Sequence, residues 1–170
     1  LIARLALNKD KIDGMVEGIR SVIALPDPSG VKRSAMELDE GLNLIQVSCP
    51  IGVIGAIFES RPDAVPQISS LCLKSGNAVI LKGGREAQNS NKVIVGFLKD
   101  AIKKVIGVPD GALQMIETRS EVQDMLKEEN LINLIIPRGS NEFVKYIQDN
   151  TKIPVLGHSE GICHNYIDKD

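Results

Sequence analysis

The sequence predicts a doubly wound α/β layer, a parallel sheet covered by helices on both faces, preceded by a helix and a β-hairpin. From residue 51 onward, apolar runs alternate with stretches of helical periodicity, which is typical of a parallel sheet. The runs at 51–58, 77–82 and 131–136 are strongly apolar, as expected of strands buried on both faces. A chain of 170 residues with 43% hydrophobic content can bury one such core.

The first 48 residues are expected to lie outside this layer. Apolar residues recur at helical spacing from 9 to 25, which indicates an amphipathic helix within an N-terminal helical segment, 1–30. The Pro-Asp-Pro-Ser-Gly run at 26–30 ends that helix. Residues 31–48 are then predicted to form a hairpin, turning at 39–41, as an arm beyond the main core.

Helices are predicted between the strands of the layer. The first has Pro66 in its first turn and Gly76 as its C-terminal stop. The second runs from about 90 to 105, with apolar residues four apart at 93, 97, 101 and 105.

Two further helices are predicted from their caps. Ser120 has capping-box spacing to Gln123, and Ser140 caps a helix that extends to about residue 150. Shorter strands are predicted at 112–116, 153–156 and 162–167, the last two joined by a loop at 157–161.

Composition argues against several classes of partner and site. The 20 basic and 22 acidic residues nearly cancel without a basic block, which speaks against nucleic acid and membrane surfaces. No apolar run is as long as a membrane span, and no signal peptide is visible. Three cysteines and two histidines without metal-type spacing indicate reduced cytoplasmic thiols and no metal site. Because the chain begins with Leu1, we expect it to be a piece of a longer protein.

Three polar loops are expected to meet at one edge of the sheet. Loops 59–63, 82–86 and 137–140 each follow a strand, and nucleotides bind where the carboxyl ends of parallel strands meet. The G-x-G-x-x-G and P-loop fingerprints are both absent, so a dinucleotide would bind in another mode.

The residues in these loops suit a phosphate-bearing cofactor. Lys82 supplies a cation beside Gly83 and Gly84, glycines that let a ligand approach the backbone. Gly139 and Ser140 open a helix whose N–H groups suit a pyrophosphate. By themselves these residues fit an ordinary strand-to-helix turn equally well, and a plain N-cap better.

Seven motifs follow one another along nearly the whole chain, and in combination they resemble the γ-glutamyl phosphate reductases, or glutamate-5-semialdehyde dehydrogenases. These motifs are Leu-Pro-Asp-Pro (25–28), Pro-Ile-Gly-Val-Ile (50–54), Phe-Glu-Ser-Arg-Pro-Asp (58–63), Lys-Ser-Gly-Asn (74–77), Ile-Leu-Lys-Gly-Gly (80–84), Ile-Ile-Pro-Arg-Gly-Ser (135–140) and Gly-His-Ser-Glu-Gly-Ile-Cys-His (157–164). The chain is also similar to the C-terminal half of pyrroline-5-carboxylate synthase.

This resemblance implies a Rossmann-like sheet of the aldehyde dehydrogenase type that binds NADPH without the glycine fingerprint, in a fragment that lacks the catalytic domain. It makes 49–170 the NADP-binding domain and 31–48 the oligomerisation arm of a homo-oligomer. It also implies that Lys82 contacts the adenosine ribose and Gly139–Ser140 the pyrophosphate. Arg85 is our own candidate for the 2′-phosphate, because a guanidinium can bind phosphate through two hydrogen bonds.

The implied reaction is the reduction of L-glutamyl 5-phosphate by NADPH to L-glutamate 5-semialdehyde and phosphate, in proline biosynthesis. A cysteine thiolate displaces phosphate, and the resulting thioester is reduced by hydride. That cysteine lies in a Cys-Asn-Ala motif expected beyond residue 170, so Cys163 is not the nucleophile and this piece alone should be inactive. Arg61 and His158 are candidates for contact with the acyl phosphate or the thioester oxygen.

Other interpretations remain open at this point. One is a non-catalytic nucleotide-binding or scaffold fragment, which would lose support if the gene continues into a Cys-Asn-Ala motif. Another is an aldehyde dehydrogenase with a different acyl substrate, against which the segments at 60–63 and 158–164 speak. A glutamate kinase, separate or fused to the chain, is the candidate protein partner.

Overall fold

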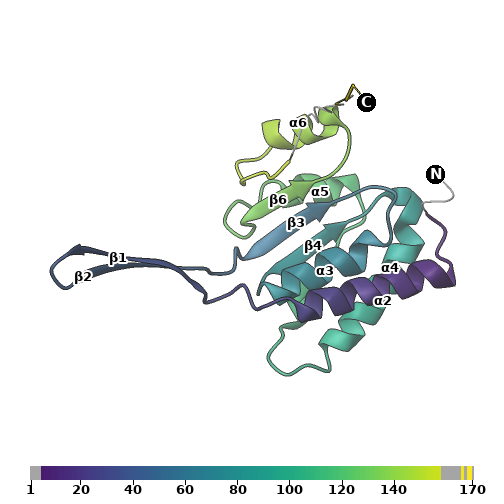
Figure 1. The fold of residues 1–170 in the computed structure, drawn as a ribbon. Helices are drawn as coiled ribbons and strands as arrows, with labels where there is room; N and C mark the ends of the chain where they lie inside the picture. The colour runs from purple at the N-terminus through teal and green to yellow at the C-terminus, as the bar shows by residue number, and fades with distance from the viewer. Residues whose placement is uncertain (1–4, 158–165, 167, 170) are drawn as a thin grey trace.

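The computed structural model describes residues 5–157, 166 and 168–169, and its elements follow the predicted order (Figure 1). These elements are α2 (Lys9–Ala24), β1 (Lys32–Asp39), β2 (Leu42–Val47), β3 (Val53–Ile57), α3 (Ala64–Lys74), β4 (Ala78–Lys82), η1 (Arg85–Ala87), α4 (Gln88–Ile102), η2 (Asp110–Ala112), β5 (Leu113–Met115), α5 (Arg119–Met125), β6 (Leu134–Pro137) and α6 (Asn141–Asp149).

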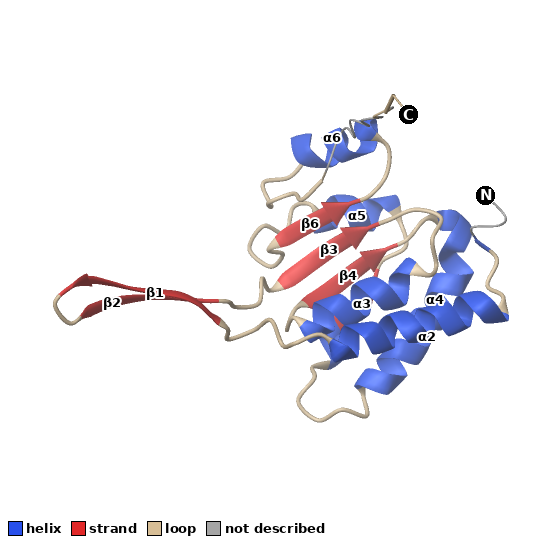
Figure 2. Cartoon of the chain, viewed as in Figure 1, coloured by secondary structure: helices blue, strands red, loops and turns tan. Residues whose placement is uncertain are grey.

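The central sheet consists of parallel strands in the order β5-β4-β3-β6. Figure 2 shows β4, β3 and β6 of this sheet side by side. From β3 the chain moves outward through β4 to β5, and it then returns to place β6 on the other side of β3. Ligands bind at such a reversal in open α/β sheets, beyond the carboxyl ends of the strands. Because Ile57 pairs with both Lys82 and Pro137, the ends of β3, β4 and β6 lie level at this edge.

Each face of the sheet has its own apolar core. On one face, Ile54 and Leu81 pack in a cluster with side chains of α3 and α4. On the other face, Ile57 and Ile135 pack with side chains of α5 and α6. Successive residues of β3 therefore point to opposite faces, as strand geometry requires. The predicted doubly wound layer is confirmed.

Two asparagines hold the start of β3, one directly before β4 and one directly before β6. The Oδ1 atom of Asn77 accepts a hydrogen bond from Gly52 N at 2.8 Å, and that of Asn133 accepts one from Val53 N at 2.8 Å. Gly52 has a φ of +119°, and a Cβ there would lie 2.1 Å from Asn133 Oδ1. Only glycine therefore fits this position.

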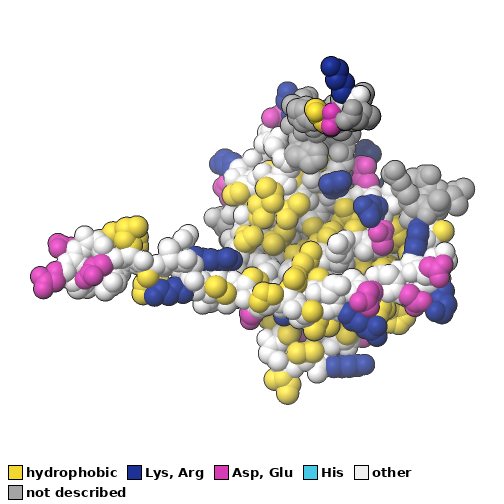
Figure 3. All heavy atoms as spheres, in the orientation of Figure 1, with side chains coloured by type: hydrophobic (Ala, Val, Ile, Leu, Met, Phe, Trp, Pro, Cys, Tyr) yellow, Lys and Arg dark blue, Asp and Glu magenta, His cyan; other side chains and the backbone are white. Residues whose placement is uncertain are grey.

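The hairpin of β1 and β2 extends away from the α/β body (Figure 1), as predicted. All residues of both strands are exposed, and they include large apolar side chains such as Met36 (61% exposed) and Leu42 (58%). Figure 3 shows hydrophobic side chains on the surface of this arm. Helix α2 packs on α3, where Lys74 Nζ donates to the Ile23 carbonyl at 3.2 Å.

The predicted apolar face of α4 is wrong. Its buried side chains are Asn91, Val95 and Ile102, whereas Val93 and Phe97 of the predicted stripe are 59% and 73% exposed. The helix carries two apolar stripes, and the one that includes the polar Asn91 packs on the sheet.

Smaller differences concern the ends of elements. Thr118, not Ser120, caps α5, and it forms a full capping box with Glu121. The strand predicted from 131 begins at Leu134, and the one predicted at 153–156 is reduced to a single bridge at Val155. The strand predicted at 162–167 falls largely outside the described residues. No helix in the described part of the chain has the length and apolar character needed to cross a bilayer.

Candidate functional site

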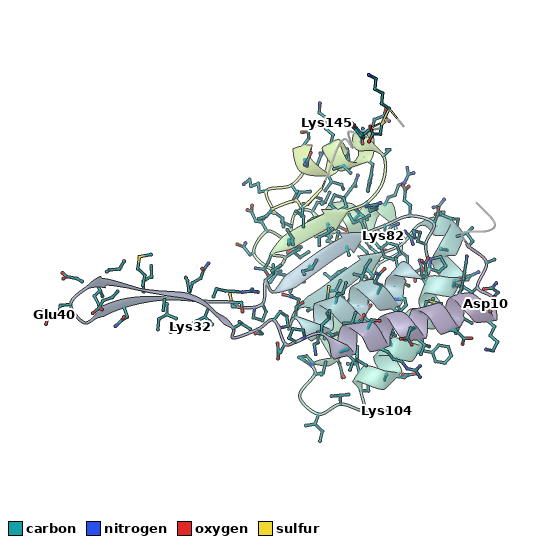
Figure 4. All side chains as sticks on the ribbon, viewed as in Figure 1. Asp10, Lys32, Glu40, Lys82, Lys104 and Lys145 are labelled. Atoms are coloured by element: carbon teal, nitrogen blue, oxygen red, sulfur yellow. The ribbon has the colours of Figure 1, made fainter. Side chains whose placement is uncertain are left out.

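The three predicted loops begin side by side at the carboxyl edge of the sheet. Phe58 N donates to the Lys82 carbonyl at 2.9 Å, and Arg138 N donates to the Ile57 carbonyl at 2.7 Å, so pairing continues just past the strands. Figure 4 labels Lys82 at the end of β4, on the sheet and away from the arm that carries Lys32 and Glu40. The expectation that these loops share one edge is confirmed.

One cavity at this edge, which we call the Lys82 pocket, has a volume of about 940 Å³. It brings together three of the predicted cofactor residues, Lys82, Gly84 and Arg85. The remaining lining comes from the end of β3 and the loop after it, from η1 and the start of α4, from α5 and the residues before it, and from α6: Ile57, Phe58, Glu59, Ser60, Glu86, Gln88, Glu117, Thr118, Arg119, Val122, Gln123, Phe143 and Tyr146.

The Lys82 pocket is lined by side chains of both charges, and Lys82 is affected by several of them. Partial burial lowers the pKa of Lys82, and the positive charges of Arg119 and Arg85 lower it further, while Glu86 opposes the shift. Lys82 Nζ donates to the Gly83 carbonyl at 2.7 Å, which holds the ammonium at the strand end. Lys82, Arg85 and Arg119 line this pocket, and so do the carboxylates of Glu59, Glu86 and Glu117, so a phosphate group would bind beside the cations of a pocket whose charges balance.

The two glycines after Lys82 leave room that the chain itself fills. A Cβ at Gly83 would lie 2.0 Å from Asn91 Nδ2, and one at Gly84 would lie 2.2 Å from Glu86 Oε1. Their small size therefore admits an amide and a carboxylate of the following helices, which sequence reasoning did not foresee. Gly84 still lines the Lys82 pocket, whereas Gly83 does not line it and packs against Asn91.

A second cavity of about 850 Å³, which we call the Arg61 pocket, lies on the other side of the β3 loop. Two predicted residues line it, Arg61 and Gly139. Its other lining residues are Lys11, Gly14, Met15, Gly18, Glu59, Ser60, Asp63, Pro66, Gln67 and Arg138. Arg61 Nη2 lies 3.1 Å from Asp63 Oδ2, and the Arg61 side chain stays 62% exposed.

Helix α2 contributes a wall to the Arg61 pocket that sequence reasoning missed. Gly14 and Gly18 lie four residues apart, and a Cβ at either would meet open space. Glycines inside a helix cost up to about 1 kcal/mol each relative to alanine, so their spacing was the available signal.

The N-terminus of α6 also lies at this edge. Ser140 is its N-cap, with Oγ accepting from Phe143 N at 3.3 Å, as predicted. A Cβ at Gly139 would lie 2.9 Å from Phe143 Cδ1, so this position favours glycine for its close packing.

Ser60 and Glu59 line both pockets, and Ser60 is unusual in its backbone. Its φ is +47°, in the left-handed region, which is uncommon for a residue other than glycine. Glu86 Oε1 accepts hydrogen bonds from Ser60 Oγ at 2.6 Å and Ser60 N at 2.8 Å. These bonds lower the pKa of Glu86. Nothing in the sequence indicated this link, because Ser60 and Glu86 lie 26 residues apart.

Neither described cysteine belongs to either pocket. Cys49 is exposed, and burial raises the pKa of the Cys72 thiol to about 11, so Cys72 is protonated at neutral pH. His158 and Cys163 lie outside the residues that the structure describes. Within the described ranges, no group of His, Cys, Asp and Glu side chains is arranged to hold a metal ion.

Known proteins resemble this chain in both sequence and fold. The chain is 61% identical over 168 residues to a gamma-glutamyl phosphate reductase of Methanococcoides burtonii, covering 99% of this chain and 37% of the relative. Crystal structures of gamma-glutamyl phosphate reductases from Thermotoga maritima and Saccharomyces cerevisiae match with TM-scores of 0.85 and 0.83, at 39% and 48% identity. These matches cover 91% and 92% of this chain, and 38% and 40% of those structures.

The chain thus spans less than two fifths of the length of that curated relative. A model of the aldehyde dehydrogenase family matches residues 4–157, which includes the whole sheet and the loops at its carboxyl edge. The chain belongs to the aldehyde dehydrogenase family.

Proposed function

We propose that this chain is the cofactor-binding part of an NADPH-dependent γ-glutamyl phosphate reductase, acting in proline biosynthesis in the cytoplasm. The reaction would reduce L-glutamyl 5-phosphate to L-glutamate 5-semialdehyde and phosphate. The observation that carries the proposal is the 61% identity to a relative of that name across 168 residues. The two adjoining pockets at the sheet edge support it, because a reductase needs neighbouring sites for cofactor and substrate.

The Lys82 pocket has the residues that a nicotinamide dinucleotide requires. Its converging cations suit phosphate groups, and the Lys82 ammonium can donate hydrogen bonds to ribose hydroxyls. In this proposal Lys82 holds the adenosine ribose and Arg85 holds the 2′-phosphate in the Lys82 pocket, and the pyrophosphate extends to Gly139–Ser140 at the start of α6, of which Gly139 lines the adjoining Arg61 pocket. When bound, the nicotinamide supplies the hydride that converts the acyl group to an aldehyde.

The Arg61 pocket is our candidate for the acyl phosphate. Arg61 and Arg138 line it from loops that follow adjacent strands, and both are suited to pairing with a carboxylate or a phosphate. The thiolate that displaces phosphate would come from outside the described residues, because Cys72 is buried and protonated and Cys49 lines neither pocket. The role of this part of the protein is then to bind and orient both reactants.

We further propose that the β1–β2 hairpin mediates homo-oligomerisation, with 1–30 as a helical segment and 49–170 as the NADP-binding domain. A two-stranded hairpin is at best marginally stable alone in water. Both faces of this one are exposed and carry apolar side chains, which supports a role in contact with another copy. A glutamate kinase, separate or fused, would supply the acyl phosphate.

The cofactor assignment can be tested by titrating the chain with NADPH and NADH while following nicotinamide fluorescence. We expect Lys82→Ala to weaken both cofactors by roughly ten- to a hundredfold, the loss of one charged hydrogen bond. Arg85→Ala should weaken NADPH by a similar factor and leave NADH unchanged. Lys104→Ala is the matched control, since Lys104 is exposed in the turn after α4, away from Lys82 (Figure 4).

The reaction itself is best tested in reverse on the whole gene product. Glutamate 5-semialdehyde should reduce NADP⁺ steadily only when inorganic phosphate is present, because phosphate attacks the thioester, forms the acyl phosphate and releases the cysteine thiolate for the next turnover. Equal rates with other aldehydes, or without phosphate, would refute the proposed substrate. If Arg85→Ala binds NADPH as tightly as the wild type does, the proposed contact between Arg85 and the 2′-phosphate is refuted.

A further inference from the structure

One side chain, that of Glu86, connects the two pockets, and the proposed function assigns it no role. Glu86 lies in η1, directly after Arg85, and lines the Lys82 pocket. Its Oε1 atom accepts both hydrogen bonds from Ser60, which belongs to the loop after β3 and lines both pockets. Residues 26 positions apart in the chain are thereby joined across the sheet edge.

This link holds a conformation that the loop would otherwise avoid. Ser60 is the one non-glycine residue in the described part of the chain with a positive φ. Such a backbone costs of order 1 kcal/mol or more, and it persists only where the surroundings impose it. The Glu86 carboxylate supplies that constraint, and it is seated in turn against the Cα of Gly84, where a Cβ would clash with all three carboxylate atoms.

The backbone conformation of Ser60 sets the position of the Arg61 backbone. Pro62 is buried directly after it, so the backbone on both sides of Arg61 is fixed, by a hydrogen-bonded turn and by a packed ring. The Arg61 side chain itself is mostly exposed, with one ion pair to Asp63. Its placement in the Arg61 pocket therefore depends on the backbone more than on contacts of its guanidinium.

Glu86 lies beside the cations of the Lys82 pocket. Its charge acts on Lys82, and its position on the single turn of η1 is shared with Arg85. A phosphate-bearing ligand that attracts the side chain of Lys82 or Arg85 would change the interactions of the η1 turn, and Glu86 belongs to that turn. Any movement of this carboxylate is passed to Ser60 through two short hydrogen bonds.

We propose that Glu86 is a positioning residue that couples the Lys82 pocket to the Arg61 pocket, setting the Ser60–Arg61 backbone according to whether an anionic dinucleotide is bound. The coupling of cofactor to substrate rests on the proposed function, whereas the link between Glu86 and Ser60 does not. The simpler alternative is a structural staple, which would stabilise the loop without making it sensitive to the ligand.

Amide hydrogen exchange of residues 58–61 tests the link in the free chain. Glu86→Ala should speed exchange of this segment at least about tenfold, because Ser60 N loses its acceptor. Glu86→Gln should stay near wild type, since the amide oxygen can still accept both bonds. The matched control, Glu128→Ala, removes an exposed carboxylate outside both pockets and should change nothing. Unchanged exchange in Glu86→Ala overturns the inference, whether or not any cofactor binds.

Adding NADPH distinguishes coupling from a staple. In the wild type and in Glu86→Gln, saturating NADPH should slow exchange of 58–61 further, and in Glu86→Ala this response should vanish at saturating NADPH. A response that survives in Glu86→Ala overturns the proposed coupling. Failure of the wild type to bind NADPH refutes the proposed function instead, and it refutes ligand coupling with it.

Kinetics of the whole gene product give the final comparison. Glu86→Ala should raise the KM for the acyl substrate or its aldehyde about tenfold, whereas Glu86→Gln should leave it near the wild-type value. The same substitution in an Arg61→Ala background should add little, because Glu86 acts through the placement of Arg61. Additive effects of the two substitutions would show that Glu86 acts by another route.

Discussion

The packing beneath the Lys82 loop allows one substitution to be worked out in detail. In Gly83→Ala, the new Cβ would lie 2.0 Å from Asn91 Nδ2, which is 1.4 Å short of an ordinary 3.4 Å contact. The Asn91 side chain is 1% exposed and Phe58 Cε2 lies 3.4 Å away on another side, so neither neighbour can simply move aside. Either the loop or α4 must shift.

Overpacking of this kind costs about 1–3 kcal/mol. In a domain of this size, 1 kcal/mol corresponds to roughly 2–4 °C in melting temperature, so Gly83→Ala should melt about 2–12 °C below wild type. The matched control is Gly96→Ala, within α4, where a Cβ meets open space. It should be more stable than wild type by up to about 1 kcal/mol, because alanine favours helix.

Thermal unfolding followed by circular dichroism measures both variants. Because the clash is with one amide, Asn91→Ala should restore most of the stability lost in Gly83→Ala, and the two substitutions should be strongly non-additive. Asn91 Oδ1 is buried without a hydrogen-bond partner, so its removal alone should cost little. The reasoning is refuted if Gly83→Ala melts with wild type, or if Asn91→Ala gives no rescue.

Three further outcomes are expected. Thr118→Ala should cost about 1 kcal/mol in urea unfolding and Ser120→Ala almost nothing, since Thr118 is the cap; equal losses would contradict the capping box. Hydrogen bonds lower the pKa of Glu86, so its stabilising contribution is present above about pH 4.3 and is lost as pH falls through the lowered pKa. Glu86→Gln should therefore lose less stability than wild type on acidification, and parallel pH curves would argue against this. Iodoacetamide at neutral pH should modify exposed Cys49 and spare Cys72 until urea is added; similar native rates would contradict its raised pKa.

Sequence reasoning succeeded where the pattern has only one solution. The apolar run that ends in Lys82 can only be a strand of a covered sheet, and its neighbours then place three loops at one edge. The hairpin was likewise readable from its turn at Gly41, where φ is +76°. In both cases local chemistry and the fold agree.

It failed where two solutions fit the same pattern. Helix α4 offers one stripe with Phe97 and another with Asn91 and Val95, and no rule based on apolarity selects a stripe with a buried amide. Thr118 and Ser120 each stand three residues before a Glu or Gln, so either could cap α5. The Ser60–Glu86 contact could not be foreseen, because it depends on how two loops meet.

The base of the hairpin has a consequence for how the molecule can be taken apart. Gly30 N donates to the Ser48 carbonyl at 2.9 Å, and Ser48 N donates to the Val31 carbonyl at 3.0 Å, so the chain leaves and re-enters the body at one point. An insertion with adjoining ends can be excised or transplanted without straining its host. Joining residue 30 to residue 48 should therefore leave the α/β layer intact, which makes this arm a detachable module.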